Sequence, residues 1–133
     1  MTKLTKNFTL SEFLVSSTAK HKGVENTPSC QEVENIKKLA NTMQQLRDYI
    51  GKPIIINSGF RSVVVNNLVG GSKTSSHLSG LAADFYVKGV SAKSLADTID
   101  LINIKYDQLI VYPNHVHLGV GGKERQHRFS SGY

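Results

Sequence analysis

The stretch from Ser29 to Gly51 constrains the fold of this chain most, because it specifies one long helix and marks both of its ends. Ser29 and Glu32 have the spacing of a capping box, while Gly51 and Pro53 end the helix. The apolar residues between these ends recur at steps of three and four, with a single-residue step at two places, and form one stripe. They are Val33, Ile36, Leu39, Ala40, Met43, Leu46, Tyr49 and Ile50. This helix is predicted to serve as scaffold.

Four segments have the composition or the alternation of strands. Residues 54–57 are a mostly β-branched run, and the side chains of residues 81–87 alternate between two faces. Residues 107–112 and residues 115–120 flank the turn at Pro113-Asn114, and this arrangement predicts a β-hairpin.

Shorter elements complete the expected architecture. A brief helix is expected to end at Ser16, and two more are expected over residues 62–69 and 92–102. Residues 19–29 are predicted to be a loop, and the glycine-rich, basic tail over residues 121–133 is predicted to be loosely held. Together the elements predict an α+β fold, a small and mainly antiparallel sheet with helices on one face.

Alternation along two of the strands places polar side chains opposite the apolar ones. Asp84 and Tyr86 share one face of their strand, and His115 and His117 share one face of theirs. If the apolar faces of both strands point toward the helices, Asp84 and His117 lie on the same open face. His77 would reach this face from the preceding loop.

Two histidines and one carboxylate are a usual set of ligands for catalytic zinc, with a fourth position left for water. Such a site can activate water to attack a carbonyl near neutral pH. The alternative for each histidine taken alone is an ordinary polar residue of the surface or the core. His21, which lies between two lysines of the expected loop, is interpreted as exposed and not as a ligand.

Composition limits the other function classes. A length of 133 residues suits one domain, spanning 1–133, and the single cysteine, Cys30, excludes an internal disulfide and a thiolate-rich metal site. The net charge of +6 favours anionic partners such as nucleic acid or the bacterial envelope. Lysine and arginine are dispersed without interleaved aromatics, so we do not expect nucleic acid as the main partner. No membrane span and no signal peptide are expected, which predicts a protein made in the cytoplasm.

Three fragments resemble the zinc D-Ala-D-Ala carboxypeptidase family, which includes related phage endopeptidases that cut peptidoglycan stems. The fragments are SGFRS, GGSKTSSHLSGLAADF and HVHLGV, and their order and spacing are similar to those of the family. The specific part is His-x6-Asp followed later by His-x-His. The resemblance implies one zinc ion per chain and the architecture of the zinc-bearing signalling domain of hedgehog proteins.

The resemblance also implies roles for single residues. His77, Asp84 and His117 match the zinc ligands. Arg61 matches the arginine that binds or polarises the substrate carbonyl, although a structural role in its loop remains the alternative. His115 matches the first histidine of His-x-His, which could orient water, stabilise an oxyanion or shuttle a proton.

The loop before His77 offers further hydroxyl groups. Ser75 and Ser76, with Thr74 before them, could hydrogen-bond a substrate carboxylate, but the solubility of a polar loop explains these residues equally well.

One position departs from the pattern of the family. Many relatives place an acidic residue a few positions before the last ligand as general base, and here it would fall near Tyr112. The sequence between Gln108 and His117 contains no acid, and the nearest carboxylate is that of Asp107. Either His115 serves as base, or Asp107 approaches through the fold, or the enzyme is weakened.

The leading hypothesis is a zinc metallopeptidase that hydrolyses peptidoglycan stem peptides as a D-Ala-D-Ala carboxypeptidase. One alternative is an endopeptidase that cuts L-Ala–D-Glu, and another is a non-catalytic, zinc-stabilised module that binds wall peptide or a protein. We expect a monomer that reaches the anionic cell wall after release, as a phage or prophage lysin does.

Overall fold

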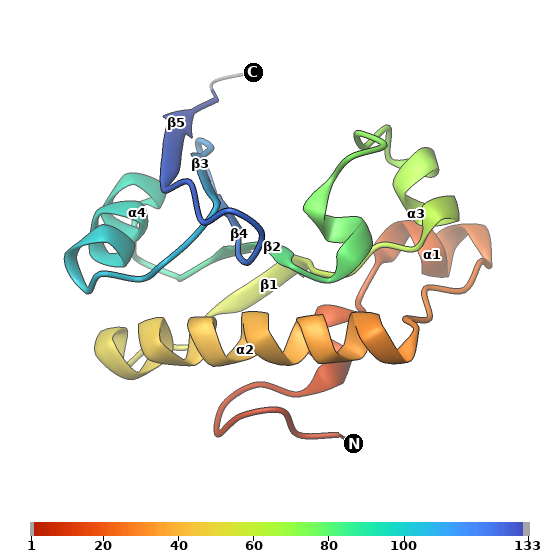
Figure 1. Ribbon diagram of the computed structural model, residues 1–133, viewed down its shortest axis with the longest axis horizontal. Coiled ribbons are helices and arrows are strands. Elements are labelled where there is room, and N and C mark those ends of the chain that lie inside the picture. The colour runs from red at the N-terminus through yellow and green to blue at the C-terminus, as the bar shows by residue number, and fades with distance from the viewer. Residues whose placement is uncertain (1, 132–133) are drawn as a thin grey trace.

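The computed structural model describes residues 2–131, which form helices and five strands (Figure 1). Two short 3-10 helices, η1 and η2, span Leu10–Phe13 and Ser76–Ser79. The four α-helices are α1 (Ser17–Lys22), α2 (Cys30–Ile50), α3 (Val63–Leu68) and α4 (Ala92–Leu101). The strands are β1 (Ile55–Ser58), β2 (Ala82–Tyr86), β3 (Gln108–Val111), β4 (Val116–Gly119) and β5 (His127–Ser130).

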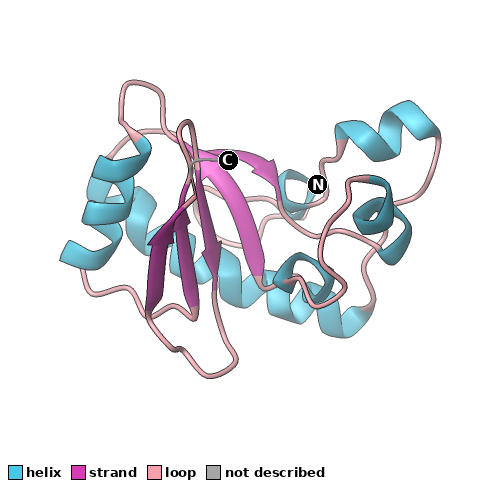
Figure 2. Cartoon of the chain, turned by 90° about the horizontal axis from the view of Figure 1, so that it is seen from above, coloured by secondary structure: helices cyan, strands magenta, loops and turns pink. Residues whose placement is uncertain are grey.

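The five strands make one sheet, which Figure 2 shows in magenta. Their order in the sheet is β1-β2-β4-β3-β5. All neighbouring pairs are antiparallel except β3 and β5, which are parallel. β3 and β4 form the expected hairpin. The prediction of an α+β fold with a mainly antiparallel sheet is therefore confirmed.

Helices α2 and α4 pack on the apolar face of the sheet. The buried stripe of α2 includes Ile36, Leu39 and Met43, which share one core with Phe85 of β2 and Leu118 of β4. Both ends of α2 are as predicted: Ser29 and Glu32 form the capping box, and Gly51 takes the left-handed conformation at the C-cap. Tyr49 departs from the expected stripe: it lies in the last turn of α2 and is 59% exposed.

The predicted loop over residues 19–29 is partly wrong, because α1 occupies residues through Lys22. The backbone N–H of Ala19 donates to the Ser16 hydroxyl at 3.1 Å, and Gly23 ends the helix at φ 68°. Ser16 is thus a helix start where an end was expected. A serine can mark either boundary in a sequence, and only its backbone geometry distinguishes the two.

The prediction of a loosely held tail is wrong for residues 127–130, because they form β5. The Gln126 side chain accepts a hydrogen bond from the backbone of Tyr106 at 2.6 Å, and the backbone of His127 donates to Asp107 at 3.1 Å. Arg128 then binds Asp97 and Asp100 of α4. Partners this distant along the chain leave no local signal in the sequence. Residues 132–133, the end of the predicted tail, lie outside the described residues.

Within residues 2–131, no helix combines the length and the apolar character needed to cross a membrane.

Candidate metal centre

The open face of the sheet brings Asp84 and His117 together, as the alternation predicts. Asp84 in the middle of β2 lies directly opposite His117 in β4 in the antiparallel register. Directly opposed residues of an antiparallel pair point to the same face with their Cβ atoms about 5 Å apart. His77 approaches from η2, so that one ligand atom from each of the three side chains lies within 4.8 Å of the others.

Backbone contacts hold both the ring and the main chain of His77. Its Nδ1 lies 2.6 Å from the Gly59 carbonyl oxygen, and its own carbonyl accepts a hydrogen bond from the Arg61 N–H at 3.0 Å. The side chain is only 3% exposed. A ligand histidine whose second nitrogen donates to a backbone carbonyl has a fixed tautomer and a fixed ring orientation. His77 therefore presents Nε2 to the cluster.

Gly80 lets η2 approach α2 closely. A Cβ at Gly80 would lie 2.9 Å from the Glu32 carbonyl oxygen and 2.9 Å from the Ile36 side chain. Gly80 also has φ +80°, which disfavours residues with a side chain. The Asn35 amide completes this contact by donating to the Ser79 carbonyl at 2.9 Å. Helix α2 thus positions the first ligand as well as the core.

Asp84 carries the charge of the cluster. Its Oδ1 lies 3.2 Å from His77 Nε2 and 2.9 Å from His117 Nδ1. Burial raises the pKa of this carboxyl, but the hydrogen bonds and charge interactions of His117 and His77 outweigh burial and hold the pKa well below its ordinary value. Asp84 is therefore ionised near neutral pH, which is the state a metal ligand requires.

The donor set fits a zinc ion. If Nδ1 of His77 donates to Gly59, then Nε2 directs a lone pair at the Asp84 carboxylate, an arrangement that needs a proton or a cation between the two atoms. Two imidazole nitrogens and one carboxylate oxygen are also the ligand types of catalytic zinc sites. His77, Asp84 and His117 could therefore hold such an ion.

Arg61 lies beside the cluster, on the other oxygen of Asp84. Its Nη2 is 3.7 Å from Asp84 Oδ2, and its Nε donates to the Ser58 hydroxyl at 3.2 Å. The guanidinium side chain is 17% exposed. A half-buried cation at this position can stabilise negative charge that develops next to the metal ligands.

Asn66 is a residue of the site that sequence reasoning missed. It is 1% exposed, its Oδ1 lies 3.4 Å from Arg61 Nη1, and its amide donates to the Ser72 carbonyl at 2.9 Å. A Cβ at Gly71 would clash with Asn66 Oδ1. The sequence feature that could have indicated this contact is the glycine pair Gly70-Gly71 before the polar loop, since Gly71 leaves room for Asn66 to reach Arg61.

His115 lies in the turn before β4 and is half-buried. Its ring stacks on the ring of Tyr112, with centroids 4.5 Å apart and planes 12° apart, and the Tyr112 N–H donates to the His115 carbonyl at 2.9 Å. An aromatic ring thus occupies the position at which the family resemblance implies an acid.

Asp107 lies just before β3, and its carboxylate is bound by Arg125. Three hydrogen bonds of 2.9 to 3.2 Å join the two residues. Hydrogen bonds from Arg125 hold the pKa of the Asp107 carboxyl below its ordinary value. The structure does not bring Asp107 into the cluster of His77, Asp84 and His117, and a lowered pKa does not suit a general base at neutral pH.

The serines before His77 serve the loop itself. The Ser75 hydroxyl accepts a hydrogen bond from the His77 N–H at 3.2 Å, and the Ser76 carbonyl accepts one from the Leu81 N–H at 3.1 Å. Both residues line a hollow of about 520 Å³ between the loop and the first turn of α2. Contact of Ser75 or Ser76 with a substrate stays a prediction.

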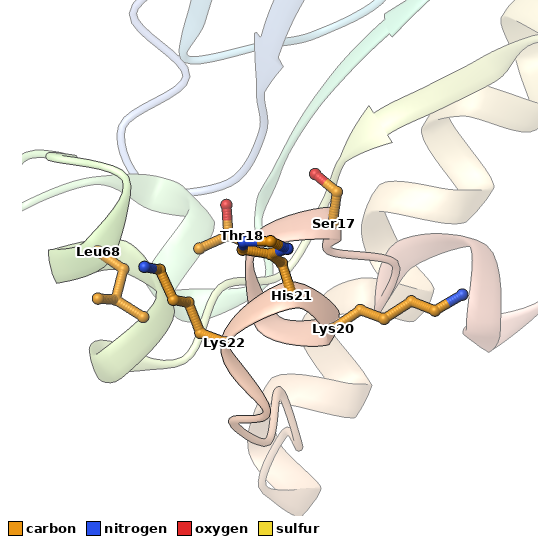
Figure 3. Close-up of a pocket in the computed structure, with 6 residues that line it drawn as sticks. All are labelled: Ser17, Thr18, Lys20, His21, Lys22 and Leu68. Carbon is orange, nitrogen blue, oxygen red and sulfur yellow. The ribbon is translucent and has the colours of Figure 1, made fainter.

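A larger hollow of about 840 Å³ lies between α1 and α3, away from the cluster (Figure 3). It is lined by Lys20, His21, Lys22 and Leu68 together with Ser17 and Thr18. His21 is exposed as predicted, but it stands on a helix and not in a loop.

Comparison with known proteins agrees with this geometry. The chain is 51% identical over 43 residues to the zinc D-Ala-D-Ala carboxypeptidase of Streptomyces albus G, a match that covers 32% of this chain and 17% of that protein. A family model described as Peptidase M15 matches residues 6–119, which include every residue of the cluster. The chain therefore belongs to the Peptidase M15 family.

Proposed function

We propose that this chain is a zinc-dependent peptidase that hydrolyses peptidoglycan stem peptides at a D-Ala-D-Ala bond. The observation that carries the proposal is the convergence of ligand atoms from His77, Asp84 and His117 within 4.8 Å, with Arg61 on the outer oxygen of Asp84. Membership of a peptidase family and the name of the Streptomyces relative support the choice of chemistry and of substrate.

His77, Asp84 and His117 would hold one zinc ion per chain. When bound, zinc supplies a Lewis acid that polarises the scissile carbonyl and activates water for attack. The backbone contacts of His77 and the strand register of Asp84 and His117 fix the ligands before metal or substrate arrives. Little reorganisation is then needed during the reaction, which is the basis of electrostatic catalysis.

Arg61 and His115 divide the remaining tasks. Arg61 offers a cation, held by Ser58 and Asn66, that stabilises the negative charge developing on the carbonyl oxygen. His115, in the turn before β4, is the candidate to move a proton, since histidine is the commonest general base and the Asp107 carboxylate is already bound by Arg125.

The proposed substrate class rests on the net charge of the chain and on the name of the Streptomyces relative. The net charge of +6 favours binding to an anionic cell wall, and the relative's name specifies D-Ala-D-Ala. Action on the wall after release, as by a phage or prophage lysin, belongs to the same proposal.

The test is digestion of purified peptidoglycan and of a pentapeptide ending in D-Ala-D-Ala, with and without a chelator, followed by mass spectrometry. We expect a loss of terminal D-Ala that the chelator abolishes and that added zinc restores. A new amino terminus on D-Glu, with D-Ala-D-Ala intact, would instead identify an L-Ala–D-Glu endopeptidase.

A second candidate function is a zinc-stabilised module that binds wall peptide without cutting it. One observation favours it: no acid lies between Gln108 and His117, and Tyr112 stacks on His115 where the resemblance implies a base. Intact substrate in the presence of one tightly bound zinc ion per chain, together with measurable binding of the pentapeptide, would support this function and overturn the peptidase.

A further inference from the structure

One row of side chains crosses the open face of the whole sheet. The register pairs Ser58 with Asp84, Asp84 with His117, His117 with Ile110, and Ile110 with Phe129. Paired residues of neighbouring strands point to the same face. Two of the three candidate ligands, Asp84 and His117, therefore stand in the middle of this row, and Phe129 stands at its β5 end.

Phe129 is the unusual member of the row. It is 38% exposed, and among the large apolar side chains exposed in residues 2–131 it is the one that lies on a strand. His127, two residues earlier on the same face, has its ring centroid 5.1 Å from that of Phe129. We call His127 and Phe129 the aromatic surface.

The aromatic surface is firmly held from behind. Between its two residues, Arg128 points to the opposite face and binds Asp100 at 2.7 Å and Asp97 at 2.8 Å, both on α4. β5 also pairs with β3 along its length, and the Ser131 N–H donates to the Val111 carbonyl at 2.9 Å. The exposure of Phe129 is therefore a property of an ordered strand and not of a loose end.

Strand spacing gives the reach of this surface. Neighbouring strands lie about 4.8 Å apart, so the Phe129 backbone is roughly 10 Å from that of His117, two strands away. An extended peptide covers about 3.3 Å per residue, so about three residues span the gap. Arg61 lies on the β1 side of the cluster, through its contacts with Ser58 and Asp84. The row thus has a cation beside its β1 end and an aromatic side chain at its β5 end.

We propose that the aromatic surface binds the part of the substrate peptide that lies about three residues N-terminal to the scissile bond. The C-terminal carboxylate end then lies toward Arg61, since that end carries negative charge. The face of the Phe129 ring can pack against the apolar part of a substrate side chain, while the His127 ring can form a hydrogen bond with the backbone of the substrate peptide. This inference rests on the proposed function. β5 lies outside the residues that the family model matches, so the inference concerns a feature of this chain beyond the part that matches the family.

The test uses peptides with the same D-Ala-D-Ala terminus and one to four residues before the scissile bond. For the wild type we expect kcat/KM to rise when the third residue is added, by roughly tenfold, the size expected when part of one aromatic side chain is buried. Phe129→Ala should lose this rise and match the wild type on the shorter peptides. Tyr49→Ala, which removes an exposed aromatic ring from α2, is the matched control and should keep the rise. Phe129→Leu replaces Phe129→Ala if thermal melting shows that the alanine variant does not fold.

Each outcome of these measurements tests either the role of Phe129 or the proposed function. An equal loss on short and long peptides would show that Phe129 is structural, and a wild type with no dependence on length would overturn the inference while leaving the peptidase in place. Hydrolysis of no peptide would mean that the proposed function fails. In that case the aromatic surface is tested by peptide binding to the zinc-loaded protein, followed by NMR of labelled phenylalanine. The long peptide, but not the short one, should shift the Phe129 signal. No shift would overturn the inference.

Discussion

The metal cluster and the β3–β4 turn lie next to each other along β4, yet the structure holds them in different ways. His77 and His117 are buried, and each is fixed by a backbone contact or by strand register. His115 is half-buried and stacks on Tyr112 in the turn. The comparison indicates that the scaffold holds the candidate metal ligands in place, whereas the residue proposed to transfer a proton is one half-exposed ring.

The largest effect should come from the cluster itself. His77→Ala and Asp84→Ala should each lose bound zinc and all turnover, because the remaining two ligands cannot complete the site. Metal content per chain, measured by inductively coupled plasma mass spectrometry after dialysis, checks this. A variant that keeps one zinc per chain would remove that residue from the ligand set.

The next largest effect should come from Arg61. Arg61→Ala should fold and retain zinc but lose about 10²–10³ in kcat, as the loss of one oxyanion donor does in other enzymes. Steady-state kinetics together with metal analysis separates the two properties. Unchanged turnover would return Arg61 to a structural role in its loop.

The β3–β4 turn gives a smaller expected effect that sharpens the comparison. His115→Ala should lower kcat about 10²-fold, at the low end for general acid–base catalysis because the ring is half-exposed, and should leave zinc in place. Asp107→Asn, measured in parallel, should lower kcat much less because Arg125 already binds that carboxylate. A larger loss of kcat in Asp107→Asn than in His115→Ala would identify Asp107 as the general base.

The smallest effect should come from the contact that orients Arg61. Gly71→Ala should displace Asn66 and lower kcat about tenfold, an order of magnitude less than direct removal of the donor. In the Arg61→Ala background the same substitution should have no further effect on kcat.

Gly70→Ala is the matched control for this contact, because Gly70 has φ +72° and open space around it. It should cost about 1 kcal/mol of stability through the left-handed backbone and leave kcat unchanged. Equal kinetic effects of the two glycine variants would contradict a specific role for Gly71. Thermal melting and kinetics of both variants give the comparison.

Local patterns in the sequence were sufficient for much of the scaffold and for the phase of the ligands. The capping box at Ser29 and the stop at Gly51 predicted α2, since both act within one turn of a helix. Alternation placed Asp84 and His117 on one face, since the period of a strand is two residues wherever the strand lies. His77 lies outside a strand and has no periodicity of its own, so its place in the ligand set was predicted from the loop that leads into β2 and from the family resemblance.

Tertiary structure alone decided the partners of each side chain. The contact of Gly80 is with α2, the carboxylate of Asp107 is taken by Arg125, and Asn66 reaches Arg61. β5 joins β3 through bonds between segments that lie about twenty residues apart in the chain. Such contacts depend on how the folded backbone brings distant groups within 3 to 4 Å, which no local pattern of residues specifies. The sequence by itself therefore determined which residues could bind a metal, and the fold determined what surrounds them.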